Sequence, residues 1–229
     1  MRIVVWNANS ISTKKAELNL FLKVNKIDIA AISETKLLPK QRFTIPGYTI
    51  YRSDRNQFGE GVMLIINNIL GHDQFYLPNL VGLKATAICL YLQNHNQLLF
   101  VSTYLPPPSA IVPADLKAIF TQNDSVVLVG VLNSKHVTWN NTSVNRNGRI
   151  LLSYCINNDI FINYPDQPTH FPHNSNPSVL DIALSKRRPI SKPLAVPALS
   201  SDHNPTVFKI HLHPAISKSW IMYDYKQAN

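Results

Sequence analysis

The stretch Leu199-Ser200-Ser201-Asp202-His203-Asn204-Pro205 ends at a proline, and the apolar run Thr206-Val207-Phe208-Lys209-Ile210 follows it directly. It places an Asp-His pair on a loop that enters an expected strand. Ser, Asp and Asn before Pro are common turn residues, so a plain turn is one interpretation. The other interpretation is a reactive site. There the carboxylate can accept a hydrogen bond from a reacting group, and the imidazole can donate one to the same group. Matching polar residues at the ends of other expected strands favour the reactive site.

Short runs of Val, Ile and Leu recur along the chain, and each is typical of a buried strand. Strands are expected over residues 3–6, 27–33, 48–51, 62–66, 84–92, 98–103, 126–131, 161–163, 178–184 and 206–210. Apolar residues at helical spacing predict helices over 14–24, 113–121 and 146–157. The early strand-helix-strand order and the later neighbouring strands together predict a mixed α/β (α+β) domain.

Length and composition indicate one folded domain. The 229 residues are 45% hydrophobic and only 15% charged, which favours a packed core over disorder. We assign residues 1–212 to the domain and 213–229 to a tail or the start of a linker, because the last residues carry no helix or strand signal. No signal peptide and no membrane-spanning run of about 20 apolar residues is apparent. Cys89 and Cys155 are expected to be buried thiols, so an intracellular location without a membrane partner is predicted.

The charge balance is strongly basic. The chain carries 22 Lys and Arg against 13 Asp and Glu, a net charge of +9. Such a surface is a reason to consider a polyanionic partner, although charge alone gives no specificity. A soluble basic protein with no nucleic-acid role is the alternative.

Polar side chains close or interrupt the apolar runs at seven positions. They are Asn7, Glu34, Tyr104, Asn133, Asp181, Asp202 and His203. Asp181 lies between Leu180 and Ile182, and a buried carboxylate costs several kcal/mol unless it is paired. We therefore expect a partner such as His203, with a solvent-facing Asp on an edge strand as the alternative.

The order of these motifs resembles the endonuclease/exonuclease/phosphatase family, and more closely the apurinic-type endonuclease domain of Jockey-like non-LTR retrotransposons (LINEs). The matching stretches are Trp6-Asn7, Ile32-Ser33-Glu34-Thr35-Lys36, Ile45-Pro46-Gly47-Tyr48, Tyr51-Arg52-Ser53-Asp54, Gly61-Val62, Tyr104-Leu105-Pro106-Pro107, 130–136, Thr138-Trp139-Asn140, 180–184 and 201–205. The resemblance implies a four-layered α/β sandwich with two packed, mostly antiparallel sheets flanked by helices. It also implies a phosphodiester hydrolase that uses Mg²⁺, with Mn²⁺ as a substitute.

The same resemblance assigns roles to individual residues. The metal-binding positions are Glu34, Asn7 and Asp202. The positions that contact phosphate are Tyr104, Asn133, His203, Ser201 and Thr169. His203, Asp181, Asn133 and Tyr104 match the catalytic set, in which Asp181 orients His203 and His203 donates to a phosphate oxygen. His136 lies in a matching motif without an assigned role, so we expect it to make a structural hydrogen bond.

One residue departs from the family pattern. The motif Gly-Asp-Phe/Leu-Asn is Gly130-Val131-Leu132-Asn133 here, so the aspartate that orients and deprotonates the attacking water is missing. Loss of a positioned general base typically costs about 10²–10⁴ in rate, or roughly 3–6 kcal/mol of barrier. Two explanations stay open: a decaying retrotransposon copy, or a DNA-binding module that no longer cleaves. Val is a good strand residue, so the fold should be retained.

The resemblance also implies partners and a cellular setting. In the retrotransposon branch the domain nicks double-stranded chromosomal DNA in the nucleus, and the freed 3′ hydroxyl primes reverse transcription. We expect a monomer, with a reverse transcriptase domain in a longer parent polyprotein. A pseudoenzyme that binds DNA through Lys186-Arg187-Arg188 and the loop 169–176 is the second hypothesis. A third keeps the fold but changes the substrate to a phosphoinositide, RNA or sphingolipid, because fold alone does not choose among them.

Overall fold

The computed structural model describes residues 1–54, 60–107 and 109–216, which fold into two packed sheets of six strands each. The first sheet contains β1 (Arg2–Asn7), β2 (Ile29–Ser33), β3 (Tyr48–Ser53), β4 (Val62–Asn67), β11 (Leu194–Ala195) and β12 (Thr206–Lys209). The second contains β5 (His72–Phe75), β6 (Lys84–Tyr91), β7 (Gln97–Tyr104), β8 (Val126–Val131), β9 (Phe161–Asn163) and β10 (Asp181–Lys186). Their orders are β11-β12-β1-β2-β4-β3 and β5-β6-β7-β8-β10-β9. Only β1–β2 and β7–β8 pair in parallel among these described strands.

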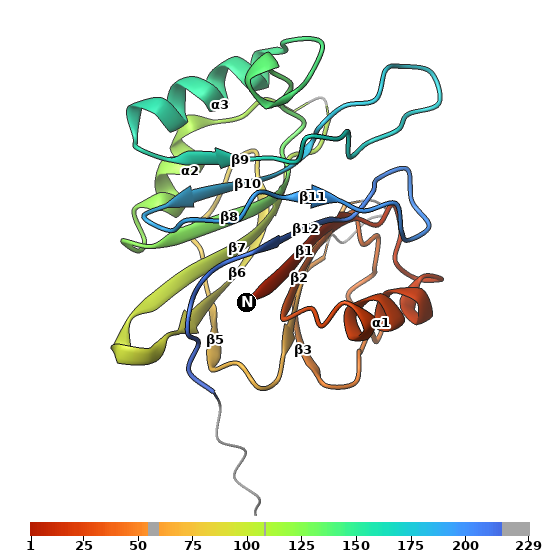
Figure 1. Cartoon of the computed structure of the whole chain (residues 1–229), viewed down its shortest axis with the longest axis vertical. Helices are drawn as coiled ribbons and strands as arrows, with labels where there is room; N and C mark the ends of the chain where they lie inside the picture. Colours follow the sequence, from red (N-terminus) through yellow and green to blue (C-terminus); the bar gives the residue numbers. More distant parts are fainter. Residues whose placement is uncertain (55–59, 108, 217–229) are drawn as a thin grey trace, which may run out of the picture.

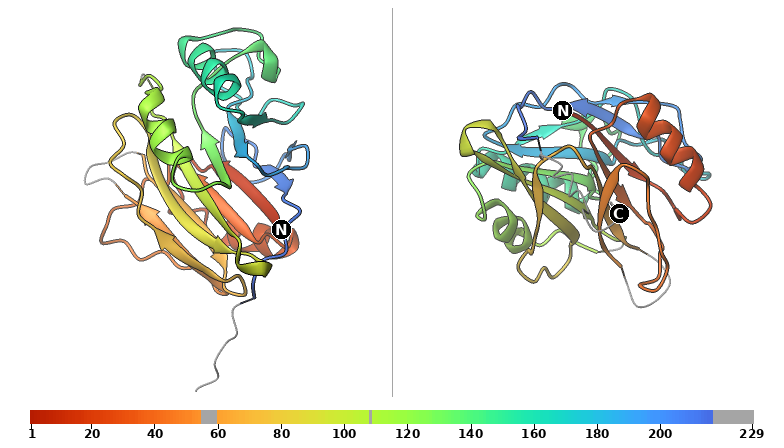
Figure 2. Two further views of the ribbon diagram at one scale, coloured as in Figure 1. Left: turned by 90° about the vertical axis from the view of Figure 1, so that its left-hand side faces the viewer. Right: turned by 90° about the horizontal axis from the view of Figure 1, so that it is seen from below.

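The helices form the two outer layers of the molecule. Helix α1 (Lys15–Val24) packs on the outer face of the first sheet, and α2 (Pro113–Phe120) and α3 (Arg146–Asn157) cover the second (Figures 1 and 2). The core between the sheets is built from alternate residues of both, such as Val5 and Phe100. The predicted four-layered sandwich is thus confirmed. None of the helices in the described ranges is long and apolar enough to cross a membrane.

Strand alternation explains why polar residues gather at one end of the space between the sheets. In β1, Ile3 and Val5 face the inter-sheet core, whereas Val4 and Trp6 face α1. Asn7 continues the inward series because successive side chains point to opposite faces. The inward series of β8 likewise ends at Val131, beside Tyr104 of β7 and Asp181 of β10 in the sheet register. This row is the floor of the candidate site.

Gly130 allows two strands to approach closely beside that row. Its φ is +146°, and a Cβ atom there would lie 1.8 Å from the backbone oxygen of Thr103 on β7. Any larger residue would therefore push β8 away from β7. The glycine of the motif is thus needed for the close approach of β7 and β8.

Several predicted elements need correction. The strand expected over 178–184 begins only at Asp181, because Leu180 and Asp181 donate their N–H groups to the Thr169 hydroxyl instead of to a neighbouring strand. The turn expected at residues 94–96 overlaps a 3₁₀ helix, η1 (Gln93–His95). A second 3₁₀ helix, η2 (Val137–Trp139), follows β8. Strands β5 and β11 were not predicted, since neither has an alternating apolar pattern.

The domain extends beyond the predicted boundary at residue 212. The backbone of Ala215 donates to Tyr91 and accepts from Gly71, and Gln93 donates to the carbonyl of His213. These bonds add residues 213–216 to the edge formed by β5 and β6. The remainder of the predicted tail, 217–229, lies outside the described residues.

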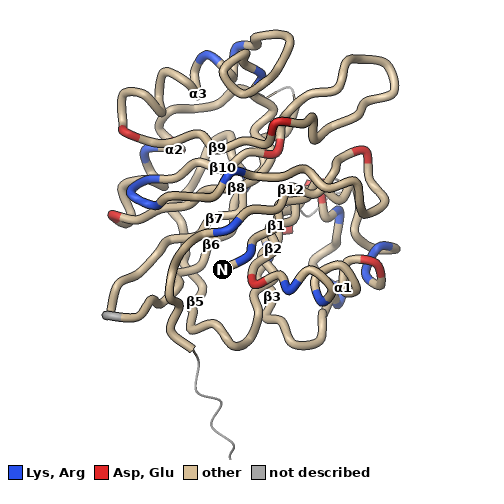
Figure 3. The backbone as a smooth tube through the Cα atoms, viewed as in Figure 1, with Lys and Arg blue, Asp and Glu red and all other residues tan. Residues whose placement is uncertain are grey.

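The basic triplet Lys186-Arg187-Arg188 lies far from the row of site residues. It follows the last residue of β10, whereas Asp181 is the first, and a six-residue strand spans roughly 17 Å. Its members are also engaged locally, for example by an ion pair between Arg187 and Asp124. Figure 3 shows Lys and Arg spread over α1, α2, α3 and the turn after β10. The triplet therefore lies at the other end of β10 from Asp181, and its expected contact with DNA stays a prediction.

Candidate active site

The loop before β12 meets the start of β10 at one end of the sandwich. His203 Nδ1 lies 2.8 Å from Asp181 Oδ2, and the two residues are 4% and 0% exposed. The expected partner of the buried carboxylate is therefore present. Because Nδ1 faces Asp181, the other ring nitrogen, Nε2, is the one directed to a further group.

Charge at this pair is set by burial and by neighbouring carboxylates. Burial opposes a charge on His203, but Asp181, followed by Asp202 and Glu34, raises the pKa of the imidazole above its ordinary value. A protonated imidazole donates from both ring nitrogens. His203 can therefore hold Asp181 and offer a second donor to an anion at the same time.

Two buried contacts fix the pair in place. Trp6 Nε1 donates to the carbonyl of His203 at 3.1 Å. The Thr169 hydroxyl oxygen accepts from the N–H groups of Leu180 and Asp181 at 3.0 and 3.2 Å. Thr169 is 0% exposed, so its observed contacts position the start of β10. The phosphate contact expected for Thr169 stays a prediction, and this burial does not favour it.

Glu34 lies at the centre of a second polar group on the first sheet. Its Oε1 accepts from Asn7 Nδ2 and from the Tyr104 hydroxyl, each at 2.8 Å. The other oxygen lies 3.6 Å from Lys36 Nζ. Glu34 has a φ of 49°, a strained backbone for a residue other than Gly or Asn. Such strain is kept where the surrounding structure fixes a residue for function.

Asn9 connects Glu34's group to the Asp-His loop. Its backbone N–H donates to Asn7 Oδ1, and its side-chain amide donates to Asp202 Oδ1 at 3.3 Å. Lys36 Nζ donates to Asn9 Oδ1 at 2.6 Å. The Ser201 hydroxyl donates to the carbonyl of Asn7 at 2.7 Å, which ties the same loop to β1. One network therefore joins the two sheets at this end.

Asp202 is the more exposed carboxylate of this network, with a side chain that is 36% exposed. Burial alone would raise its pKa, but the charge of His203 and hydrogen bonds from Asn9 and Ser201 lower the pKa below the ordinary value. Asp202 is therefore ionised at neutral pH. Its second oxygen faces His170 Nε2 at 3.5 Å.

Val131 lies in the middle of this arrangement, at the position where the motif predicts a carboxylate. It is 1% exposed and packs with Val62, Tyr104 and Leu180 in a small apolar cluster. In the sheet it pairs with Tyr104 on one side and Asp181 on the other. Position 131 thus lies between two proposed site residues, and its side chain has no atom that could accept a proton.

Asn133 lies two residues beyond Val131, at the end of β8. It has a φ of 45°, and its side-chain amide donates to the carbonyl of Leu105 at 2.7 Å. Asn145, the N-cap of α3, donates to the carbonyl of Asn133 at 2.9 Å. His136 of the same motif bonds Thr138 through Nδ1, in line with the structural role expected for it. The observed amide contact of Asn133 holds the segment after β7.

Three residues of this end were not assigned a role from sequence. They are Asn9, Lys36 and His170, each of which contacts a predicted site residue. Asn9 and Lys36 lie two positions after Asn7 and Glu34, which is the one local signal that could have indicated them. His170 carries no such signal, because a backbone bridge between distant loops brings it to His203.

The donor set at this end fits a hard divalent cation. Mg²⁺ prefers oxygen ligands and is commonly held by one or two carboxylates together with water. Glu34 and Asp202 supply two carboxylates, and Asn7 adds an amide oxygen. Lys36 Nζ, beside Glu34 Oε2, is the positive charge that the chain itself places there. Glu34, Asp202 and Asn7 are thus the residues that would hold Mg²⁺.

Comparison with known proteins agrees with the fold and the motif order. A family pattern described as "Endonuclease-reverse transcriptase" matches residues 98–207. The chain is 28% identical over 222 residues to a probable RNA-directed DNA polymerase from transposon X-element of Drosophila melanogaster, covering 92% of this chain and 24% of that protein. It is 25% identical over 223 residues to the RNA-directed DNA polymerase from mobile element jockey of Drosophila funebris, covering 93% and 24%. The chain therefore spans about a quarter of the length of these relatives.

Solved structures share the architecture. The endonuclease domain of TRAS1, a telomere-specific non-LTR retrotransposon, superposes with a TM-score of 0.72 at 19% identity, covering 92% of this chain and 98% of that domain. The Xenopus laevis APE2 catalytic domain gives a TM-score of 0.71 at 16% identity, covering 95% and 94%. These likenesses establish the fold.

The chain has the fold of endonuclease/exonuclease/phosphatase structures, and its residues 98–207 match the endonuclease-reverse transcriptase pattern. Over most of its length it is similar to proteins of jockey- and X-element-type mobile elements. The identification suggested by its motifs is confirmed.

Proposed function

We propose that this domain binds double-stranded DNA at the Glu34–His203 end of the sandwich and nicks one strand with Mg²⁺, at a rate lowered by Val131. In this proposal the nick primes reverse transcription by a further domain of a longer polyprotein, and the site of action is the nucleus. The observation that supports it most is the buried Asp181–His203 pair, which faces the Glu34–Asn7–Tyr104 group across one end of the sandwich.

His203 acts as the donor to a phosphate oxygen. Asp181 holds the ring by Nδ1, so Nε2–H is presented to the negative charge that builds up as the phosphodiester is attacked. The raised pKa of His203, caused by the neighbouring Asp181, favours the charged form of this donor. Removing one such donor from an active site typically costs about 10²–10³ in rate.

Glu34 and Asp202 would hold Mg²⁺, which supplies Lewis-acid stabilisation to the phosphate and the leaving oxygen. Tyr104 and Asn7 fix the Glu34 carboxylate through its Oε1, which leaves Oε2 for the cation in place of Lys36. Asn133, and with it Ser201, is proposed to contact the phosphate or the nucleophile. The Val131 side chain has no polar atom that could orient the attacking water, and this is the proposed cause of the lowered nicking rate.

A supercoiled-plasmid nicking assay with Mg²⁺ tests this proposal. We expect Val131→Asp to nick about 10²–10⁴ times faster than the natural chain, by the usual contribution of a general base. Adding His203→Ala to Val131→Asp should remove that gain. Adding His136→Ala should leave it, because the His136 side chain makes local contacts with Thr138 and Trp139 and none with the proposed site residues. If the natural chain and Val131→Asp both fail to nick while near-ultraviolet circular dichroism shows both folded, the nuclease proposal fails.

A DNA-binding domain without cleavage is the second candidate, and the packing of Val131 among Val62, Tyr104 and Leu180 is the observation that favours it. It predicts binding of a labelled duplex with log affinity falling steeply against log salt. Fluorescence anisotropy at several salt concentrations measures that slope. Binding of the duplex that is absent or independent of salt excludes this candidate. Separately, hydrolysis of a phosphoinositide but not of DNA would show that the domain acts on a different substrate class.

A further inference from the structure

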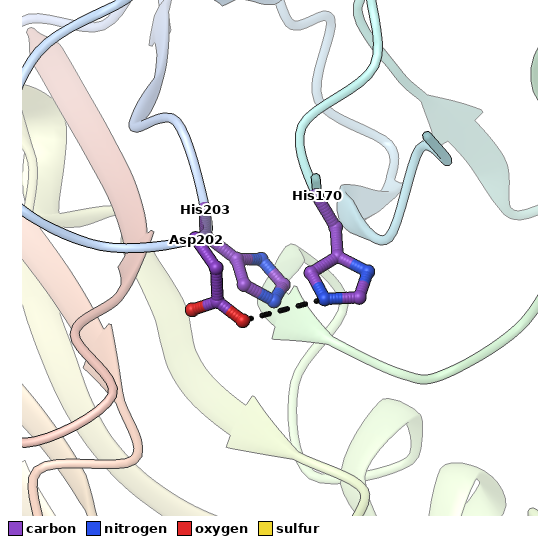
Figure 4. Close-up of side chains that lie close together, drawn as sticks. All are labelled: His170, Asp202 and His203. Carbon is purple, nitrogen blue, oxygen red and sulfur yellow. Dashed lines mark ion pairs between the residues drawn. The ribbon is translucent and has the colours of Figure 1, made fainter. Parts of the chain in front are cut away.

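His170 extends the proposed active site in a direction that the nuclease function does not use. Within the described residues, His170, Asp202 and His203 form a group whose ligand atoms all lie within 4.8 Å of one another. Figure 4 shows the three side chains converging from two loops, with the Asp202 carboxylate directed to the His170 ring. Two imidazoles and one carboxylate form a different donor set from the oxygen ligands around Glu34.

The backbone holds the two histidines opposite each other. Phe171 donates its N–H to the carbonyl of Asp202 at 2.8 Å, and Asn204 donates to the carbonyl of Thr169 at 2.7 Å. These two hydrogen bonds flank an antiparallel bridge between His170 and His203. The two histidines face each other as a non-hydrogen-bonded pair, which is the more closely spaced kind. Their ring centroids are 4.4 Å apart. The spacing is therefore built into the loops and does not depend on free side-chain rotation.

The geometry is close to that of a transition-metal site. Zn²⁺ binds imidazole nitrogen and carboxylate oxygen at about 2.0–2.2 Å, so the ligand atoms around one ion lie roughly 3.3 Å apart. His170 Nε2 and Asp202 Oδ2 are 3.5 Å apart. All ligand atoms of the group lie within 4.8 Å of one another, so they need to close by at most about 1.5 Å around one ion.

The surroundings also suit a metal. Asp181 accepts from His203 Nδ1, and a carboxylate behind a metal-bound histidine is the usual arrangement that fixes the ring and directs Nε2 to the ion. His170 Nδ1 is buried and has no hydrogen-bond partner among the described residues, so no protein contact holds this ring in another tautomer. Two imidazole nitrogens favour Zn²⁺, Co²⁺ or Ni²⁺ over Mg²⁺.

We propose that His170, Asp202 and His203 form a binding site for a borderline transition-metal ion such as Zn²⁺, which shares Asp202 with the Mg²⁺ position at Glu34 but differs from it by two imidazole ligands. An ion on Nε2 of His203 removes the donor that the nicking reaction requires. Zn²⁺ at this site therefore acts as an inhibitor of the nuclease. The inhibitory consequence rests on the proposed function, whereas the binding of the metal does not.

Co²⁺ titration of metal-free protein in excess Mg²⁺ tests the binding, because Co²⁺ at a nitrogen-containing, near-tetrahedral site gives visible absorption bands. The natural chain should bind one Co²⁺ that Zn²⁺ displaces and Mg²⁺ does not. His170→Phe keeps a ring against His203 but has no ligand nitrogen, and should weaken binding at least ten-fold. His173→Phe, an exposed histidine of the same loop, is the matched control and should bind as the natural chain does.

A second variant separates a ligand role from a packing role. Asp181→Asn, behind His203, should weaken Co²⁺ about 10–100-fold, the usual effect of losing such a support. Urea midpoints in EDTA establish that each variant is folded. Unchanged Co²⁺ affinity in folded His170→Phe, or displacement of Co²⁺ by Mg²⁺, overturns the proposal. If Val131→Asp nicks, Zn²⁺ should inhibit that nicking. Adding His170→Phe should then raise the Zn²⁺ concentration needed for inhibition by the same factor by which His170→Phe weakens Co²⁺ binding. Failure of Val131→Asp to nick bears only on the proposed function.

Discussion

Val131→Asp should restore a carboxylate at the cost of stability, and the cost can be worked out from the sheet register. Val131 is 1% exposed, and removing a buried valine side chain forfeits about 1.5–3 kcal/mol. The new carboxylate would lie directly opposite Asp181. Two carboxylates about 5 Å apart repel by about 3 kcal/mol at an effective dielectric constant of 20. We therefore expect Val131→Asp to lower the free energy of unfolding by roughly 4–6 kcal/mol, which is a large part of the 5–15 kcal/mol typical of a folded domain.

Val131→Asn separates the two contributions. It has nearly the shape of Asp and no charge, so it should lose the burial of valine but avoid the repulsion from Asp181. Urea denaturation in EDTA, followed by fluorescence of the buried Trp6 and Trp139, measures both variants against the natural chain. The Asp variant should be about 3 kcal/mol less stable than the Asn variant, the Coulomb figure above.

Mg²⁺ then tests whether position 131 faces the proposed metal site. A ligand at 100 times its Kd stabilises a folded protein by about 2.7 kcal/mol. Saturating Mg²⁺ should reduce the difference in the free energy of unfolding between the Asp and Asn variants, because the cation offsets the added negative charge. Equal stability of the two variants in EDTA would refute the close pairing of residues 131 and 181. Equal stabilisation of both by Mg²⁺ would refute the position of residue 131 beside the metal.

Three further predictions concern the framework of the site. Gly130→Ala should lower the free energy of unfolding by roughly 3 kcal/mol or more, since its Cβ would meet the Thr103 backbone oxygen; unchanged urea midpoints would contradict the close strand approach. The pKa of His203 is raised in the folded protein, so its pair with Asp181 stabilises below the ordinary pKa of 6.5 and loses that contribution as pH rises through the folded value. Asp181→Asn should flatten the decline of stability that is measured in EDTA as the pH rises above the ordinary histidine pKa of 6.5, and an unaltered pH profile would show that the pair is not the cause. Burial raises the pKa of the Cys155 thiol to about 12, so Ellman's reagent at pH 8 should reach it only after urea unfolding, and rapid native reaction would argue against this packing.

Local patterns predicted most of the framework. The most apolar strand, β8, and helix α3 have the predicted bounds, because a run of branched residues and a helical apolar stripe are each visible within one element. Strands β5 and β11 could not be predicted in this way, because neither contains such a pattern. The sequence His72–Phe75 has no apolar alternation, and its strand exists only because the backbone of β6 lies beside it. Edge pairing of this kind is determined by the neighbour and not by the segment.

The chain by itself determined which side chains could carry chemistry: a carboxylate, an amide, a tyrosine and an Asp-His pair at strand ends, together with a valine where an acid was expected. Alternation within each strand is a local property, so the inward direction of Asn7, Tyr104, Val131 and Asp181 followed from it. Only the tertiary structure decided which of them touch. The 2.8 Å pairing of Asp181 with His203, the bridge made by Asn9, and the approach of His170 all depend on how separate loops meet. Contacts between distant segments arise from sheet register and loop closure, which no short stretch of sequence encodes.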